Sequence, residues 1–161
     1  MRPIPETIPA VSYSYVELTD RQRRLVDAAR NAVGGSYAPF SNFHVGAAIE
    51  IEQPDGNFLI ISGANQENAA LGSTMCAERT AAYWAHANHP DGLFRAIAIA
   101  ARDADGKEPP TPISPCGSCR QALVEYEKLA GSPVEVWLIG AGSIIWVPSV
   151  KALLPFAFTE F

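Results

Sequence analysis

The feature that most constrains the fold is an uninterrupted apolar run, Ala-Ile-Ala-Ile-Ala, at residues 96–100. A strand with no polar residue on either face has to be covered on both faces. Covering layers are available, because amphipathic segments lie before and after the run in the chain. The run therefore predicts a layered α/β fold in which helices enclose a sheet.

Three segments have helical patterns. Thr19 and Gln22 have the spacing of a capping box, and apolar residues then recur every three or four positions until the Gly34-Gly35 pair. A second helix is expected over about residues 74–87. A third is expected over about 114–131, with a Ser-Pro pair as its N-cap and first helical residue.

Four further apolar segments, bounded by turn residues, predict strands at 45–51, 58–63, 134–139 and 144–147. The first two flank a Pro-Asp-Gly turn and suggest an antiparallel hairpin, whereas strands separated by helices imply parallel crossovers. We therefore predict one α/β domain at residues 18–161, a mixed sheet of about five strands sandwiched between helices. Residues 1–17 would form an N-terminal arm, in which alternation over 11–16 could add an edge strand.

Composition excludes several classes of function. The 161 residues are enough for one core, and 12 Lys and Arg against 17 Asp and Glu leave a net charge of −5. That balance argues against a nucleic-acid partner. Because no run of 18 apolar residues occurs, we expect no membrane partner either. The Pro-rich N-terminus lacks the apolar region of a signal peptide, and three cysteines form no closed disulfide framework, so a cytoplasmic location is expected.

The three cysteines have the spacing of a metal site. Cys76 is expected in the first turn of one helix, and Cys116 and Cys119 share a face in the first turn of another. Helix N-termini favour the thiolate form, and thiolates with a Cys-x-x-Cys pair are typical zinc ligands. Three protein ligands leave a fourth tetrahedral position open, as in catalytic zinc sites.

Other interpretations of the cysteines remain open at this point. A redox dithiol or buried free thiols would account for the Cys-x-x-Cys pair but not for Cys76, two residues before a glutamate. A closed structural site would need His86 or His89 as fourth ligand, and both lie roughly 15 Å or more along the helix from Cys76. Iron or cobalt could also occupy a thiolate site.

Two charged residues follow Cys76. Glu78 could move protons between a water at the open metal position and a substrate nitrogen, although alone it could simply complement the helix dipole. Arg79 stands three residues after Cys76. Zinc with three thiolates carries a net charge of −1, which a guanidinium beside the sulfurs would offset; the alternative is a surface arginine.

Six blocks of sequence together resemble the cytidine deaminases of nucleoside salvage. They are SYAPFSNF at 36–43, VGAA at 45–48, GANQENA at 63–69, CAERTA at 76–81, SPCGSCRQ at 114–121 and LLP at 153–155. The similarity extends from about Leu18 to Phe158. Zinc deaminases share a mechanism in which a glutamate that does not bind the metal moves the protons.

The resemblance implies an α/β/α fold and hydrolytic deamination of cytidine and 2′-deoxycytidine to uridine and 2′-deoxyuridine, with release of ammonia, in pyrimidine salvage. Cys76, Cys116 and Cys119 would hold one Zn²⁺ per subunit. Glu78 would be the proton shuttle, with Arg79 beside the ligands. The partner molecule would be a small nucleoside.

The resemblance also assigns substrate contacts. The backbone N–H of Ala77 would contact the pyrimidine carbonyl, Phe43 would pack against the base, and Asn65 and Glu67 would bind the ribose hydroxyls. An amide and a carboxylate two residues apart would present paired acceptors to a diol, although both residue types are also common in turns. Gln121 would have a supporting role behind the metal ligands.

Assembly as a homotetramer is implied as well, with Phe158 reaching a neighbouring subunit's pocket. A Phe tucked into its own core is the alternative. The sequence departs from the family at two positions: Leu71 stands where a Tyr is frequent, and His44 replaces a common Pro. We expect His44 to be structural.

Two competing functions remain to be weighed. The substrate could be a modified cytosine nucleoside, such as an antibiotic of the blasticidin type, since that related family shares the zinc blocks. A non-catalytic, zinc-stabilised nucleoside-binding module is the other possibility. Glu78 counts against it, because a structural site has no use for an acid-base group there.

Overall fold

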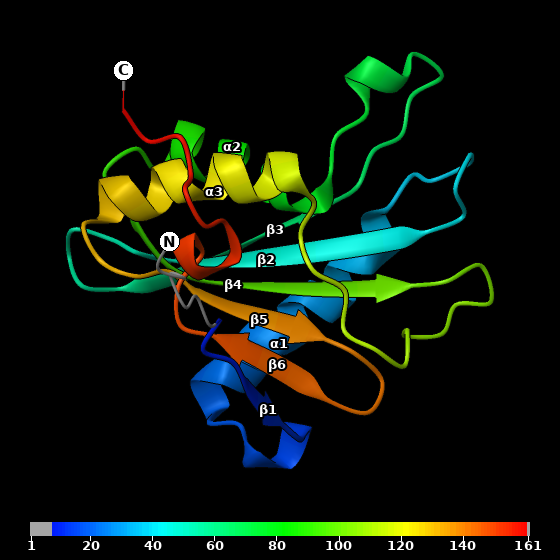
Figure 1. The fold of residues 1–161 in the computed structure, drawn as a ribbon, viewed down its shortest axis with the longest axis horizontal. Coiled ribbons are helices and arrows are strands. Elements are labelled where there is room, and N and C mark those ends of the chain that lie inside the picture. Colours follow the sequence, from blue (N-terminus) through cyan, green and yellow to red (C-terminus); the bar gives the residue numbers. More distant parts are fainter. Residues whose placement is uncertain (1–7, 161) are drawn as a thin grey trace, which may run out of the picture.

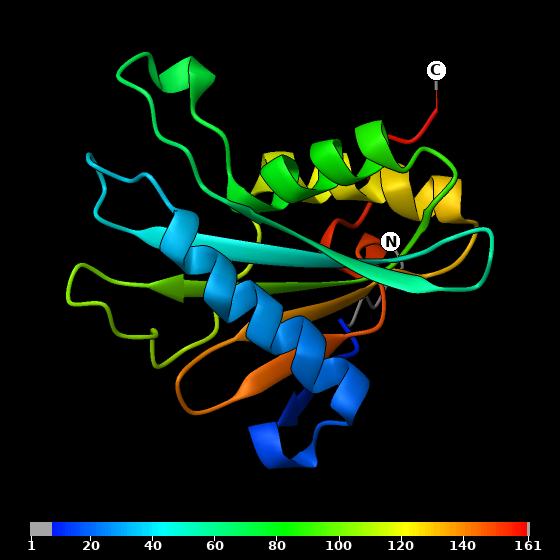
Figure 2. The ribbon, with the colours of Figure 1, turned by 180° about the vertical axis from the view of Figure 1, so that it is seen from behind.

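The computed structural model describes residues 8–160 and places them in three layers around one sheet (Figure 1). The strands are β1 (Val11–Tyr13), β2 (His44–Glu52), β3 (Phe58–Ala64), β4 (Leu93–Arg102), β5 (Glu135–Ile139) and β6 (Ile144–Val147). The helices are α1 (Asp20–Ala32), α2 (Ala77–Asn88) and α3 (Gly117–Ala130), and the 3-10 turns are η1 (Tyr15–Glu17), η2 (Val33–Gly35), η3 (Leu71–Ser73) and η4 (Lys151–Leu153). Helix α1 covers one face of the sheet, and α2 with α3 covers the other (Figures 1 and 2).

The six strands form one mixed sheet in the order β1-β6-β5-β4-β2-β3. Among the strands of residues 8–160, β4 and β5 pair in parallel, across the α3 connection, and the other neighbouring pairs are antiparallel. The predicted α/β class, the hairpin and the helix-covered faces are confirmed. The strand beyond the expected five is β1, which pairs with β6 at the edge. Expectations for residues 1–7 lie outside the described residues.

The apolar run of β4 supplies both halves of the core. Its isoleucines, Ile97 and Ile99, pack in the cluster beneath α2 and α3. Its alanines pack in the cluster beneath α1, where small side chains let the helix approach the sheet closely. Helix α1 and β2 lie closest at Gly46, where a Cβ atom would stand 2.4 Å from the carbonyl oxygen of Ala29. The predicted burial on both faces is confirmed.

The starts of α2 and α3 differ from the prediction. Thr19 caps α1 as expected, with its N–H donating to the Gln22 side chain at 2.8 Å. Helices α2 and α3 begin two to three residues later than predicted, so Cys76 and Cys116 occupy the N-cap positions. Before α2, residues 74–76 are held extended because Met75 exchanges two backbone hydrogen bonds with Gln66.

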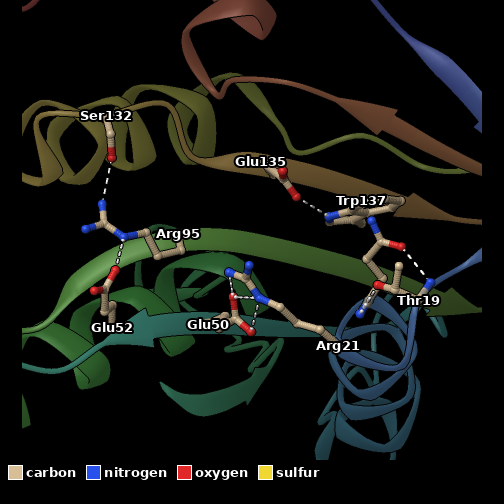
Figure 3. A network of polar contacts seen from close by, with 9 residues as sticks. Thr19, Arg21, Glu50, Glu52, Arg95, Ser132, Glu135 and Trp137 are labelled. Carbon is tan, nitrogen blue, oxygen red and sulfur yellow. Dashed lines mark hydrogen bonds and ion pairs between the residues drawn. The ribbon is translucent and has the colours of Figure 1, made fainter. Parts of the chain in front are cut away.

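Two ion pairs lie near the C-terminal end of β2 (Figure 3). Glu50 is buried on β2, and the guanidinium of Arg21 from α1 donates to both of its carboxylate oxygens. A buried carboxylate without such a partner would be strongly destabilising. Arg95 similarly bridges Glu52 and Ser132, at 2.7 and 2.6 Å. Within residues 8–160, no helix combines the length and apolar character that a membrane crossing needs.

Candidate active site

Three long loops gather at one end of the sheet, at the right of Figure 1. They are residues 36–43 before β2, 65–76 between β3 and α2, and 103–116 between β4 and α3. A cavity of about 320 Å³ lies among them. Its lining residues come from all three loops, from β2 and from the first turn of α2: Ser41, Phe43, Val45, Asn65, Glu67, Thr74, Met75, Cys76, Ala77, Glu78, Ile113, Ser114 and Cys116.

The three cysteines form one group beside this cavity. The Sγ atom of Cys116 lies 3.8 Å from that of Cys76 and 3.5 Å from that of Cys119, and all three lie within 4.8 Å of one another. Tetrahedral zinc with Zn–S bonds of about 2.3 Å requires sulfurs about 3.8 Å apart. The cysteines therefore fit zinc, with a fourth position left for a further ligand.

Neither candidate histidine joins the cysteines in the described part of the chain. His86 lies against the ring of Tyr126, and His89 contacts the side chain of Gln53. The closed structural site that these histidines could have completed is therefore wrong. The predicted three-cysteine group is confirmed as a potential metal site.

The surroundings of the thiols favour the anionic form at Cys76 and the protonated form at Cys119. A hydrogen bond from Cys119, aided by the Arg79 guanidinium, lowers the pKa of Cys76 to about 5. The pKa of Cys119 is raised, because its proton is shared with Cys76 and its side chain is buried. Arg79 Nη2 lies 3.7 Å from Cys76 Sγ, and its buried Nε has no hydrogen-bond partner among the described residues. A thiolate thus forms first at the sulfur next to the arginine.

Glu78 and Ala77 enter the cavity from the first turn of α2. The Glu78 side chain is 5% exposed, and burial raises the pKa of its carboxyl. Ala77 is the first residue of the helix, so its N–H has no partner within the helix. The first turn of α2 therefore brings an acid-base group and a backbone donor that has no partner within its helix into the cavity, next to the cysteines.

The Asn65 amide at the end of β3 is held by backbone groups. Its Oδ1 accepts from the N–H of Val45 at 2.8 Å, and its Nδ2 donates to the carbonyl oxygen of Phe43 at 2.9 Å. The hydroxyl of Ser36 lies 2.5 Å from the same Oδ1. Both acceptor sites of the oxygen are thereby occupied, so the amide can offer the cavity a donor and not the acceptor expected from the sequence.

Glu67 is held by the loop that precedes β2. Its Oε2 accepts from the backbone N–H of Phe40 at 2.8 Å and of Ser41 at 3.2 Å. Hydrogen bonds from the Ser41 side chain and from the Phe40 backbone hold the pKa of the carboxyl below its usual value. Glu67 is therefore an ionised acceptor beside the Asn65 donor. Phe43, half-buried, lines the same cavity.

Other predicted residues stand outside this chain's cavity. The Gln121 side chain donates to the carbonyl oxygen of Phe158 at 2.7 Å, which ties it to the C-terminal tail. The Phe158 side chain is 61% exposed, so the alternative that it is tucked into its own core is wrong. Leu71 lies in η3 within the loop at 65–76 and is 76% exposed.

Some lining residues had no role in the sequence analysis. Ile113 lies in the loop between β4 and α3, Ser114 was expected only as a helix N-cap, and Met75 is placed by its pairing with Gln66. Ser41, which lines the cavity, and Ser36, which contacts Asn65, lie inside the block at 36–43, which carried the resemblance but gave no role to either hydroxyl. Their serine-rich, turn-forming context was the available signal.

Comparison with known proteins agrees with this geometry. Residues 19–130 match the family described as the cytidine and deoxycytidylate deaminase zinc-binding region. Cytidine deaminase from Halalkalibacterium halodurans is 42% identical over 140 residues, which cover 87% of this chain and 95% of that protein. Cytidine deaminase from Mycobacterium tuberculosis is 37% identical over 115 residues, covering 70% and 78%.

Solved structures give the same result. The crystal structure of cytidine deaminase from Burkholderia pseudomallei superposes with a TM-score of 0.67 at 37% identity, covering 88% of this chain and all of that chain (100%). That of Mycobacterium tuberculosis superposes with a TM-score of 0.61 at 32% identity, covering 88% and 99%. With this fold, a zinc-compatible cysteine group and these similarities, the chain belongs to the cytidine deaminase family of zinc-dependent hydrolases.

Proposed function

We propose that this protein hydrolyses cytidine and 2′-deoxycytidine to uridine and 2′-deoxyuridine, releasing ammonia, as a step of pyrimidine salvage. The observation that carries the proposal is one cavity lined by a buried glutamate, two of the three clustered cysteines and the Asn65–Glu67 pair. Its volume of about 320 Å³ falls in the range of small-ligand pockets. The names of the relatives support a cytidine substrate.

Cys76, Cys116 and Cys119 would hold one Zn²⁺ per subunit. When bound, zinc supplies Lewis-acid activation of the water that attacks the substrate. Arg79 would offset the net negative charge of the ion and its three thiolates, which its position 3.7 Å from Cys76 Sγ supports.

Glu78 would move the protons. Its carboxylate takes a proton from the attacking water while the water oxygen bonds to C4 of the base, and it delivers that proton to N3. Glu78 then takes the proton of the hydroxyl that is now bonded to C4 and transfers it to the amino group. The oxygen on C4 becomes the carbonyl of uridine as the C4–N bond breaks and ammonia leaves. Its burial in the cavity wall favours this role, because bulk water is excluded from the transfer path.

The remaining lining residues would orient the nucleoside. The Ala77 N–H, unpaired within its helix, would donate to the pyrimidine carbonyl, and Phe43 would pack against the base. Asn65 would donate its remaining amide hydrogen to a ribose oxygen, while Glu67 would accept a hydrogen bond from a ribose hydroxyl. A donor beside an acceptor suits a diol, because each hydroxyl can play either part.

The protein would act as a homotetramer in which Phe158 completes a neighbour's pocket. The exposure of this side chain and its separation from its own cavity's lining support an intersubunit role. Gln121 would hold the tail in place through its hydrogen bond to the Phe158 carbonyl.

Incubating the zinc-loaded protein with cytidine, with absorbance and ammonia followed together, tests the activity. We expect conversion by the native protein and a loss of at least about 100-fold in turnover for Glu78→Ala, with zinc retained. Glu125→Ala is the matched control, since Glu125 is exposed on α3. If cytidine is untouched, a panel of modified cytosine nucleosides decides between another deaminase substrate and a non-catalytic binding module.

Mixed oligomers test the intersubunit role. Phe158→Ala subunits keep Glu78, and Glu78→Ala subunits keep Phe158. Unfolding and refolding the two together should restore activity above that of either alone if Phe158 acts on a neighbour. No recovery in mixed assemblies, or a monomer by sedimentation, would contradict the tetramer proposal.

A further inference from the structure

A chain of hydrogen bonds leads from the cavity back to a histidine that the proposed chemistry does not use. The Asn65 amide lines the cavity, and its Oδ1 lies 2.5 Å from the hydroxyl oxygen of Ser36. The same hydroxyl oxygen lies 3.0 Å from Nδ1 of His44, the first residue of β2. The three residues come from the loop before β2, from β2 itself and from the segment after β3.

The direction of each hydrogen bond in this chain follows from the backbone. The Val45 N–H can only donate and the Phe43 carbonyl can only accept, so together they orient the Asn65 amide, with Oδ1 toward Val45 and Nδ2 toward Phe43. The Ser36 hydroxyl must therefore donate its single proton to Oδ1. Because the Ser36 hydroxyl has no second proton, its oxygen can only accept a hydrogen bond from Nδ1 of His44.

His44 must accordingly carry a proton on Nδ1. His89 provides the opposite case, because the Gln53 amide nitrogen lies 3.2 Å from its Nδ1, and an amide nitrogen donates. Nδ1 of His89 is then an acceptor, and its neutral ring carries the proton on Nε2. The molecule thus contains two histidines with opposite expected tautomers.

We propose that His44 is a positioning residue for substrate binding: through Ser36 it holds the Asn65 amide so that its remaining N–H faces the ribose. This inference rests on the proposed nucleoside function and deepens it. Without the Nδ1 donor, the Ser36 hydroxyl can turn away, and Oδ1 of Asn65 keeps only the Val45 N–H as partner. The amide then holds its orientation less firmly, which weakens ribose binding without touching Glu78 or the cysteines.

Variants of His44 test this role through the split between KM and kcat. For His44→Phe we expect KM for cytidine to rise roughly fivefold, the worth of one hydrogen bond, with kcat within about twofold of native. His44→Asn should restore most of the native KM, because its amide can donate from the place of Nδ1. Ser36→Ala should reproduce the effect of His44→Phe with the histidine intact. His86→Phe, outside the cavity, is the control.

A substrate without ribose hydroxyls makes the test specific. With 2′,3′-dideoxycytidine, native protein and His44→Phe should have the same KM, because Asn65 has no hydroxyl to bind. An equal rise in KM for cytidine and for the dideoxynucleoside would overturn the proposal, as would an unchanged KM for cytidine. Failure of the native protein to convert cytidine is a separate result, which would reject the proposed function.

The tautomers of His44 and His89 can be measured by NMR, independently of enzyme activity. The folded, zinc-loaded protein is labelled with ¹⁵N-histidine, and nitrogen-proton correlation spectra are recorded above neutral pH. They should show His44 protonated on Nδ1 and His89 protonated on Nε2. Each set of signals is assigned by its loss when that histidine is replaced by Phe. Protonation of neutral His44 on Nε2 would break the chain at Ser36 and overturn the inference.

Discussion

The backbone of Gly63 on β3 lies directly against that of Ala81 on α2. A Cβ atom at residue 63 would stand 2.5 Å from the Ala81 amide nitrogen and 3.0 Å from the Ala77 carbonyl oxygen. Real side chains do not approach a backbone so closely, so only glycine permits this distance between strand and helix. The same contact places the start of α2, with Glu78, beside Asn65, two residues beyond Gly63.

Replacing this glycine should affect stability and activity together. For Gly63→Ala we expect the free energy of unfolding to fall by about 1–3 kcal/mol, because α2 must move away from β3. Cytidine turnover should fall as well, since Glu78 moves with the helix. Urea denaturation and steady-state kinetics measure the two effects. Gly142→Ala is the control, because nothing lies within 4 Å of a Cβ there; equal stability of the two variants would refute the argument.

The carboxylate of Glu127, near the end of α3, joins this helix to the residue before β5 and to the segment after β6. Its oxygens accept from the backbone N–H groups of Val134 and Val150, at 2.9 and 2.8 Å, and from the Ser149 hydroxyl at 2.8 Å. In Glu127→Gln an NH₂ group would face donors, so we expect a loss of about 2 kcal/mol in unfolding free energy. Glu125→Gln, exposed on the same helix, should be neutral by the same denaturation measurement.

The layers of the fold could be predicted because residues 96–100 carry the signal locally: a strand without polar residues needs two covers. The starts of α2 and α3 could not. A Thr at 74 and a Ser-Pro pair at 114 are good helix starts by composition, yet the backbone pairing of Met75 with Gln66 keeps the first of them extended. That pairing joins segments whose contact is invisible in the sequence.

In the candidate site too, local patterns could be predicted from the sequence and long-range contacts could not. The cysteine spacing and Glu78 are local patterns on helix starts. The structure brings the three cysteines together and places two of them in the wall of the cavity that Glu78 also lines. The acceptor role predicted for Asn65 is wrong, because both acceptor sites of its Oδ1 are filled by Ser36 and Val45, 29 and 20 residues earlier in the chain. The residue type predicts an amide at this position, but only the tertiary structure shows which atom of the amide is free to bind a substrate.

Arg120 ties the metal-binding segment to the C-terminal part of the chain. Its guanidinium donates to the carbonyl oxygens of Pro115 at 2.8 Å and Leu153 at 3.0 Å, and to the Ser114 hydroxyl at 2.9 Å. Pro115 directly precedes Cys116, so we expect Arg120→Met to loosen that ligand and to lower zinc affinity by about tenfold or more. Competition with a chromogenic chelator measures it. Arg24→Met, an exposed arginine of α1, should keep native affinity.

The hydrogen bonds to Glu67 predict how nucleoside binding depends on pH. The Ser41 side chain and the Phe40 N–H hold the pKa of this carboxyl below its usual value, so the carboxyl stays ionised until the pH falls through that lowered value. We therefore expect a flat KM for cytidine between about pH 7 and pH 5 in the native protein. In Ser41→Ala the pKa rises toward its ordinary value, so KM should begin to increase at a higher pH than in the native protein. Glu67→Gln, which has no ionisable group there, should have a raised KM that does not change over the same range. A native KM that already climbs well above pH 5, in parallel with Ser41→Ala, would show that these hydrogen bonds do not set the ionisation of Glu67.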